Sequence, residues 1–166
     1  ISPDTYPFEL PCFGSGDYRA TAIRIKNKNG DSICQFEYEG HRIFNGRIEL
    51  TGLPFASADT NTETLELQLI DKLTNCNVKL YYTVFPEEDI ISRYITVTNL
   101  GNADAIIEKL MSLSLDLPGC NYDMISLYGS HCNERNYQRT PLFFGTQSIC
   151  SRRGASSHQF NPFISV

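Results

Sequence analysis

The chain has 166 residues, of which 41% are hydrophobic and 20% charged, with a formal net charge of −5 and a pI of about 5.1. This composition predicts a soluble globular chain that can bury a sizeable core, and it excludes an intrinsically disordered protein. The acidic balance argues against a nucleic-acid partner, and no apolar run is long enough to span a bilayer.

The dominant pattern along the chain is a period of two, which is typical of antiparallel strands with one solvated face. It first appears at residues 34–38, where apolar side chains alternate with Gln35 and Glu37. Just before it, residues 29–31 read Asn-Gly-Asp. That sequence predicts a type I′ hairpin turn, because both central residues of such a turn need a positive φ.

The same alternation predicts strands over residues 64–69, 78–84 and 91–97, with Arg93 interrupting the last of them. Turns are predicted between these strands and after them, at residues 73–77 and 100–102. Residues 105–117 begin with helical spacing and continue with a period of two, and we predict a strand because the neighbouring segments are strands. The whole chain, residues 1–166, is therefore predicted to be a single all-β domain, an antiparallel β-sandwich of two packed sheets.

The cysteines are scattered rather than grouped. Their even number would permit three disulfides. A chain of this size needs no covalent staples, so we favour free thiols in a reducing cytoplasm. No cluster has the ligand spacing of a zinc site, so neither a metal nor a cofactor is predicted. The six are Cys12, Cys34, Cys76, Cys120, Cys132 and Cys150.

Two segments carry polar groups that could have a function. In the first, residues 13–19, Asp17 and Arg19 point the same way if the backbone is extended, and the simplest interpretation is an ion pair between them. The second, residues 151–163, is dense in hydrogen-bond donors, and the simplest interpretation is a loop that fixes its own backbone, with Asn161 capping a turn before Pro162. Asp116 and Asp123 are interpreted as turn-forming residues around a Pro-Gly pair.

These two segments, with the stretch between them, resemble the N-terminal domain of microbial α-galactosidases of glycoside hydrolase family thirty-six. The resemblance covers nearly the whole chain in order, and one departure is Phe160, where the family commonly has a histidine. The matching segments are residues 14–19, 41–43, 64–71, 82–85, 111–118, 122–129, 134–135 and 147–158.

The resemblance implies that the chain is part of a β-supersandwich that precedes a catalytic (β/α)₈ barrel. In this family, two barrel carboxylates about 5–5.5 Å apart carry out retaining hydrolysis of terminal α-galactosides such as melibiose and raffinose. The chain has no alternating βα pattern, so we expect a truncated, non-catalytic fragment that is inactive by itself. The parent is expected to be a cytoplasmic bacterial enzyme and a tetramer in which this domain packs on the barrel and helps to close a neighbouring sugar pocket.

By the same resemblance, Asp17 and then Arg19 are the candidates for the sugar pocket or an interface. Arg152, Arg153, His158 and Asn161 are candidates for a domain interface. A cut sandwich exposes strand edges, so we expect the fragment to self-associate through an edge strand. The alternatives are a stand-alone carbohydrate-binding β-sandwich, which would need exposed aromatic side chains, and a structural interaction module.

Overall fold

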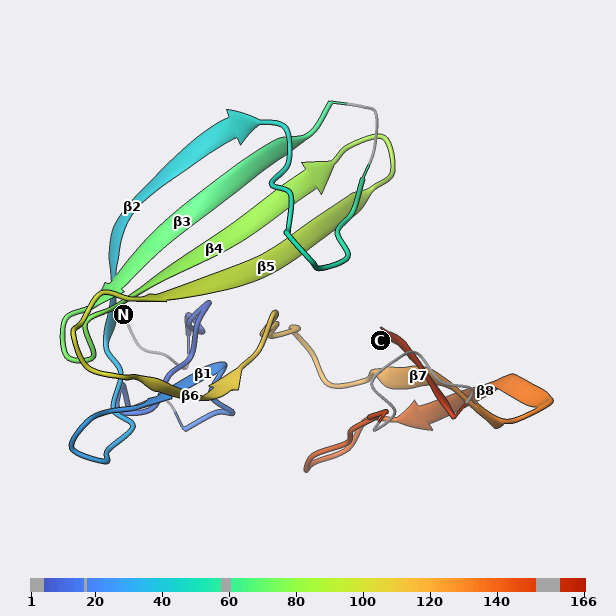
Figure 1. Ribbon diagram of the computed structural model, residues 1–166. Coiled ribbons are helices and arrows are strands. Elements are labelled where there is room, and N and C mark those ends of the chain that lie inside the picture. Colours follow the sequence, from blue (N-terminus) through green and yellow to red (C-terminus); the bar gives the residue numbers. More distant parts are fainter. Residues whose placement is uncertain (1–4, 17, 58–60, 152–158) are drawn as a thin grey trace. The chain divides into compact units, whose positions relative to one another are not determined.

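The computed structural model describes residues 5–16, 18–57, 61–151 and 159–166. Over these ranges the chain forms nine β-strands and no helix, and all strands that pair in sheets run antiparallel (Figure 1). The predicted all-β, antiparallel fold class is therefore confirmed. The chain divides into two compact units, Ile1–Asp116 and Leu117–Val166.

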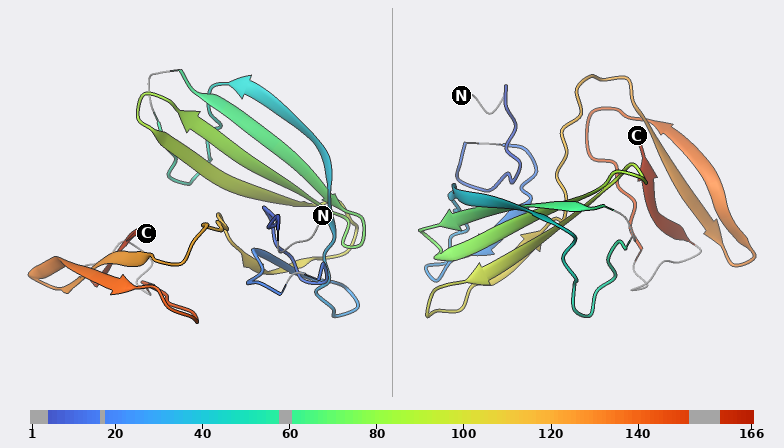
Figure 2. Two further views of the ribbon diagram at one scale, coloured as in Figure 1. Left: turned by 180° about the vertical axis from the view of Figure 1, so that it is seen from behind. Right: turned by 90° about the horizontal axis from the view of Figure 1, so that it is seen from above.

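The larger sheet of the first unit is a meander of four consecutive strands, which Figure 2 shows as one twisted layer. The alternation over 64–69, 78–84 and 91–97 predicted three of these strands, and the alternation at 34–38 marked the start of the fourth. In order across the sheet they are β2 (Phe36–Asn45), β3 (Glu63–Asp71), β4 (Cys76–Phe85) and β5 (Ile90–Asn99).

The turns of this unit follow the predicted positions, although one has a different geometry. Residues 72–75 form the turn of the β3–β4 hairpin, with Asn75 at a φ of 55°, whereas Cys76 and Asn77 of the predicted range already pair in β4. At the Asn-Gly-Asp sequence, the Asn27 N–H donates to the Asp31 carbonyl and only Gly30, at 91°, has a positive φ. The type I′ prediction is therefore wrong. The chain uses a type I turn followed by a left-handed glycine, which is the usual three-residue hairpin loop.

A second, smaller sheet pairs β1 (Ile23–Lys26) with β6 (Ile106–Leu110). The predicted strand over 105–117 is confirmed only at 106–110. The Met111 N–H still bonds the Ala22 carbonyl, but the Ser112 carbonyl accepts from the guanidinium of Arg93 instead of from a neighbouring strand. The strand ends there because its backbone partner has been replaced by a side chain.

The core of the first unit lies between these two sheets. Ile23 and Ile25 of β1 are fully buried, as are Val78 and Leu80 of β4, and Leu67 packs against the cluster. Since cross-strand and inter-sheet apolar contacts stabilise a sandwich, this cluster holds β1 and β6 onto one face of the meander. Three cysteines, Cys12, Cys34 and Cys76, are part of it, and none of the six cysteines forms a disulfide.

The opposite face of the meander is polar but not solvated, contrary to the expectation from alternation. Thr64 and Glu66 of β3 have no exposed surface. The Thr64 hydroxyl donates to the Gly46 carbonyl and lies 2.8 Å from the Thr83 hydroxyl. The segment after β2 therefore covers this face, and buried polar groups there are satisfied by hydrogen bonds.

The second unit is a three-stranded sheet with β7 (Asp123–Ser130) between β8 (Asn133–Pro141) and β9 (Phe160–Ser165). Asn161 lies in β9, so the prediction that it caps a turn is wrong. Between the pairs Ser126–Ile164 and Tyr128–Phe160, β9 has two more residues than β7. This bulge on an edge strand accommodates Pro162, which has no N–H to give to the ladder.

Over the described ranges no helix is long and apolar enough to cross a membrane. In the same part of the chain, no three His, Cys, Asp or Glu side chains gather as they would around a metal ion.

Candidate functional site

The turn that leads into Asp17 is built from glycines in conformations that other residues avoid. Gly14 has a φ of 100° and Gly16 a φ of 78°. A Cβ added to Gly14 would lie 2.6 Å from Cγ2 of Ile33. The Ser15 hydroxyl donates to the Cys12 carbonyl at 3.1 Å and closes the turn. Close packing and a positive φ together require glycine at position 14.

The turn is followed by a side-chain contact to a distant part of the sequence. Nη1 of Arg19 lies 3.0 Å from Oδ2 of Asp116, and the two side chains are 35% and 45% exposed. Asp116, expected to flank the turn at the Pro-Gly pair, therefore also pairs with a distant arginine. An ion pair this exposed contributes about 0–1 kcal/mol to stability, so its main effect is to fix geometry.

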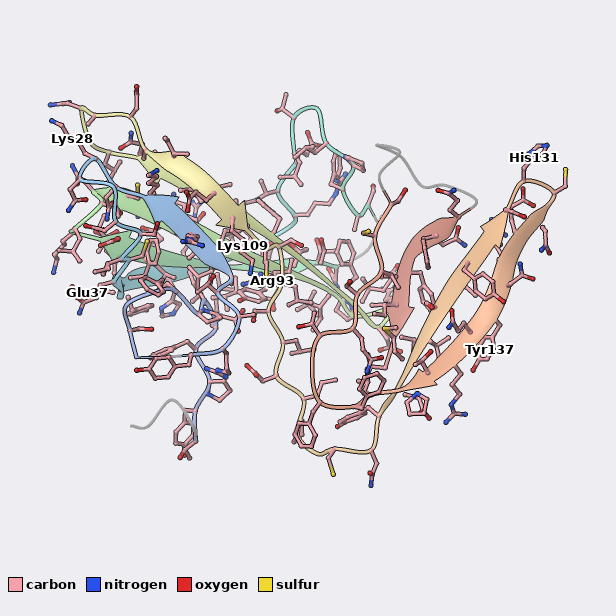
Figure 3. All side chains as sticks on the ribbon, turned by 90° about the horizontal axis from the view of Figure 1, so that it is seen from below. Lys28, Glu37, Arg93, Lys109, His131 and Tyr137 are labelled. Atoms are coloured by element: carbon pink, nitrogen blue, oxygen red, sulfur yellow. The ribbon has the colours of Figure 1, made fainter. Side chains whose placement is uncertain are left out.

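A second arginine also fixes the segment after β6, and its side chain is more deeply buried. The side chain of Arg93, labelled in Figure 3, is only 6% exposed, and its Nη2 lies 2.9 Å from Oε1 of Glu9. Its Nε donates to the Tyr82 hydroxyl at 3.1 Å, and its Nη1 donates to the Ser112 carbonyl. A buried charge needs an opposite charge and partners for its donors. Glu9 supplies the opposite charge to Arg93, and Nε and Nη1 are hydrogen-bonded, whereas Nη2 makes the ionic contact without a hydrogen bond.

The electrostatics of this network keep Tyr82 neutral. Its hydroxyl donates to the carboxylate of Glu9, and the guanidinium of Arg93 lies 5.3 Å from the centre of its ring. Burial, together with the hydrogen bond to Glu9, raises the pKa of Tyr82 to about 12. Tyr82 therefore acts as a hydrogen-bond donor at physiological pH and not as a proton-transfer group.

Together, the two arginines hold the segment after β6 against the first unit. Arg93 binds it at Ser112 and Arg19 binds it at Asp116. This segment is where the first unit ends. The arrangement can position backbone and present a turn, but it brings no pair of carboxylates together for acid–base chemistry.

An apolar hollow of about 400 Å³ opens beside the glycine turn. Leu10 and Cys12 at its base belong to the buried core, whereas Phe8 at its rim is 44% exposed. Phe13, in the turn itself, is 56% exposed. Aromatic side chains exposed beside a hollow are typical of a surface that receives another protein segment.

The predicted site residues are only partly placed by the structure. Asp17, Arg152, Arg153 and His158 lie outside the described residues, so the predicted Asp17–Arg19 pair has no structural test. Arg19 is half-buried and bonded to Asp116, which makes it a positioning residue in this structure.

Sequence reasoning missed the Arg93 network, although one signal for it was visible. Arg93 breaks an apolar alternation, and a charge at a core-facing position of a strand needs a partner. The identity of that partner, Glu9, could not be read from the sequence. Asp123 was likewise misread as a turn former: it begins β7, and Nε of Arg139 on β8 donates to its carboxylate at 2.8 Å.

Comparison with protein families gives one match across the whole chain. The model of the glycosyl hydrolase family 36 N-terminal domain matches residues 1–166. Among curated proteins, the bifunctional α-galactosidase/sucrose kinase AgaSK of Mediterraneibacter gnavus is 41% identical over 98% of the chain. α-Galactosidase AgaA of Geobacillus stearothermophilus is 39% identical over all of it, and a fungal relative, α-galactosidase 2 of Hypocrea jecorina, is 37% identical.

Solved structures give the same result for the fold. The crystal structure of AgaA superimposes with a TM-score of 0.93 over 99% of this chain. The galactosidase domain of AgaSK superimposes with a TM-score of 0.91. The chain spans 18% of the length of AgaSK and 23% of the length of AgaA.

Proposed function

Because the chain belongs to the glycosyl hydrolase family 36 N-terminal domain family, we propose that it works as the non-catalytic N-terminal β-domain of an α-galactosidase. The observation that carries this proposal is the match of sequence and fold from one end of the chain to the other. The substrates would be terminal α-galactosides, since one solved relative is a complex with raffinose and another a complex with stachyose.

In this proposal the catalytic carboxylates belong to another part of the enzyme. The described residues contain no βα-barrel, and the best-defined carboxylate in them, Glu66, has no exposed surface and is bound by Arg42 and Lys79. A carboxylate with no exposed surface cannot reach a sugar to attack it, and one held ionised by two cations has no proton to donate.

The role of the domain would be to pack on the catalytic region, to support assembly of the oligomer and to close the sugar pocket. The tight glycine turn, the Arg19–Asp116 pair and the apolar hollow support a docking role for residues 13–19. Asp17 follows the turn directly, and a carboxylate there could accept charge-assisted hydrogen bonds from sugar hydroxyls. Arg152, Arg153, His158 and Asn161 would serve the domain interface.

The test is a chimera in which this chain replaces the matching segment of the Geobacillus enzyme AgaA. We expect the chain alone to leave an α-galactoside unhydrolysed and the chimera to hydrolyse it. In the chimera, Asp17→Ala should lower kcat/KM by about tenfold or more, or weaken assembly. Asp104→Ala, at an exposed aspartate of the first unit, is the matched control. An Asp17→Ala chimera with unchanged kinetics and unchanged oligomeric state would reject the role of Asp17, and an inactive, folded chimera would reject the domain assignment.

A second function, a carbohydrate-binding module, is favoured by the aromatic side chains of the second unit. Tyr137 on β8 is 60% exposed and Phe143 is 69% exposed, and Phe144 is fully exposed beside it. Such rings can stack on sugars. A calorimetric titration of the chain with raffinose would give heat only under this second proposal.

We further propose that the enzyme works in the cytoplasm as a homo-oligomer. Six cysteines in one chain, none of them in a disulfide, support a reducing compartment. Fractionation of the source cells, with the α-galactosidase activity followed, would test the location.

A further inference from the structure

The dipeptide Asn-Gly occurs twice in the sequence, at residues 29–30 and 45–46. The main-chain nitrogen that follows an asparagine can attack the side-chain amide, and glycine favours this attack because it has no side chain to hinder the approach. Gly30 and Gly46 have the same φ of 91°, and each has open space where a Cβ would lie. What distinguishes the two dipeptides is how the surrounding structure holds them.

The four-stranded sheet holds the second dipeptide. Asn45 is the last residue of β2 and pairs with Glu63 of β3. The Gly46 N–H donates to the Thr62 carbonyl at 2.7 Å, and the Gly46 carbonyl accepts from the hydroxyl of the fully buried Thr64, also at 2.7 Å. For the Gly46 nitrogen to attack Asn45, bonds that join β2 to β3 would have to break. Paired strands open rarely, so the sheet protects this asparagine.

The first dipeptide is held by a contact within its own loop. Asn29 and Gly30 are both exposed, in the hairpin loop whose Lys28 is labelled in Figure 3. The Gly30 N–H donates to the Asn27 carbonyl at 2.9 Å and so closes a turn instead of joining two long strands. Exposed loops open at much lower free energy than paired strands do. The Gly30 nitrogen is therefore released far more often than the Gly46 nitrogen.

We propose that Asn29 is a site of spontaneous covalent modification, in which the main-chain nitrogen of Gly30 attacks Cγ of Asn29 and the side-chain amide is lost. The new N–Cγ bond closes a succinimide ring. The Cγ–Nδ2 bond breaks, and ammonia leaves with the proton of the Gly30 N–H. Water then opens the ring at one of its two carbonyl carbons, which gives aspartate or isoaspartate. In isoaspartate the main chain runs through Cγ, so the hairpin loop becomes longer by a backbone carbon.

The modification places a new negative charge beside Asp31. Oδ1 of Asp31 accepts from the Asn27 amide at 2.6 Å and from the Ile33 N–H at 3.2 Å. These hydrogen bonds, with a further one from the Asn29 amide, hold the pKa of Asp31 below its ordinary value. A carboxylate at position 29 replaces that last donor by a like charge, which repels Asp31. Because Ile33 lies against the glycine turn at Gly14, the change occurs next to the segment with the proposed docking role.

The test uses the whole chain, incubated in a mildly alkaline buffer once in the folded state and once unfolded in urea. Alkaline buffer speeds the reaction because the attacking nitrogen must lose its proton. Peptide mapping by mass spectrometry measures the loss of each amide, and chromatography separates aspartate from isoaspartate. Asn45, followed by a glycine of the same φ in the same molecule, is the matched control.

In urea we expect Asn29 and Asn45 to be converted at similar rates, because each is followed by glycine. In the folded chain, the ratio of the Asn29 rate to the Asn45 rate should be larger than in urea by about tenfold or more. A ratio that is no larger in the folded chain than in urea overturns the proposal. So does a folded chain in which neither asparagine is converted while both are converted in urea, since the turn would then protect Asn29 as well as the sheet protects Asn45. These outcomes are independent of the chimera test, because the reaction needs no catalytic region.

Discussion

Replacement of Glu66 by glutamine tests how the polar face of the meander is stabilised. The carboxylate of Glu66 has no exposed surface. Its Oε2 lies 2.7 Å from Nη2 of Arg42, and its Oε1 lies 3.5 Å from Nζ of Lys79 and accepts from Gln68 at 2.7 Å. Burial alone would raise the pKa of Glu66, but hydrogen bonds from Arg42, Gln68 and Tyr81 and the charge of Lys79 outweigh it and lower the pKa to about 2.

The size of the effect follows from that pKa. A fall from 4.5 to about 2 corresponds to about 3 kcal/mol in favour of the folded state with Glu66 ionised. Because the folded-state pKa is depressed, this stabilisation is complete above about pH 4.5 and is lost as the pH falls towards 2. At pH 3.5, about 1.4 kcal/mol of this stabilisation of about 3 kcal/mol has been lost.

We therefore expect Glu66→Gln to lower the free energy of unfolding at pH 7 by about 3 kcal/mol. At pH 3.5 the gap, which is the difference in free energy of unfolding between the variant and the unmodified chain, should be about 1.4 kcal/mol narrower. Urea unfolding followed by circular dichroism at both pH values measures this. Glu63→Gln, at an exposed carboxylate on the same strand, is the control and should change stability by less than about 0.5 kcal/mol. A Glu66→Gln gap that is the same at both pH values, or wider at pH 3.5, would refute the reasoning.

Two further stability predictions follow from the glycine turn and the ion pair beside it. Gly14→Ala should destabilise the chain by about 2–4 kcal/mol, because it adds both a strained φ and a 2.6 Å contact with Ile33. The control Gly30→Ala has a similar φ but open space around the added methyl group, so it should cost only about 1 kcal/mol. Equal losses in thermal unfolding would mean that Ile33 moves aside freely. A double-mutant cycle of Arg19→Ala and Asp116→Ala should give a coupling free energy of about 0.5 kcal/mol, and a value above about 2 kcal/mol would contradict the exposed geometry of the pair.

The strands that could be predicted from the sequence are those whose burial follows the pattern of hydrophobic residues. In β4, Val78 and Leu80 are buried and apolar, so the period of two is visible. In β7 the buried positions are Met124 and Ser126, and the apolar Ile125 on the other face is half-buried, so no clean alternation appears. A strand of this kind is defined by its neighbours in the sheet, which lie elsewhere in the sequence.

The candidate site shows the same limit for individual side chains. Closely spaced glycines such as Gly14 and Gly16 are typical of a tight turn, and the structure has one there. Whether Arg19 would pair with a nearby or a distant carboxylate could not be decided from spacing, because Asp116 is brought to it only by the β1–β6 pairing. The polar face on which Glu66 lies was expected to be solvated, since nothing in its own strand reveals the cross-strand partners Arg42 and Lys79.

The pairing of β1 with β6 also sets an order for the folding of the chain. Ile23 lies opposite Leu110, with the whole meander between them in the sequence, whereas β2 to β5 pair only with their neighbours along the chain. Closing a long loop costs more entropy than closing a hairpin, so the hairpins form first and the small sheet closes last. During synthesis the apolar face of β4 therefore stays uncovered until residue 110 has left the ribosome, and this is the interval in which a chaperone would have a surface to hold.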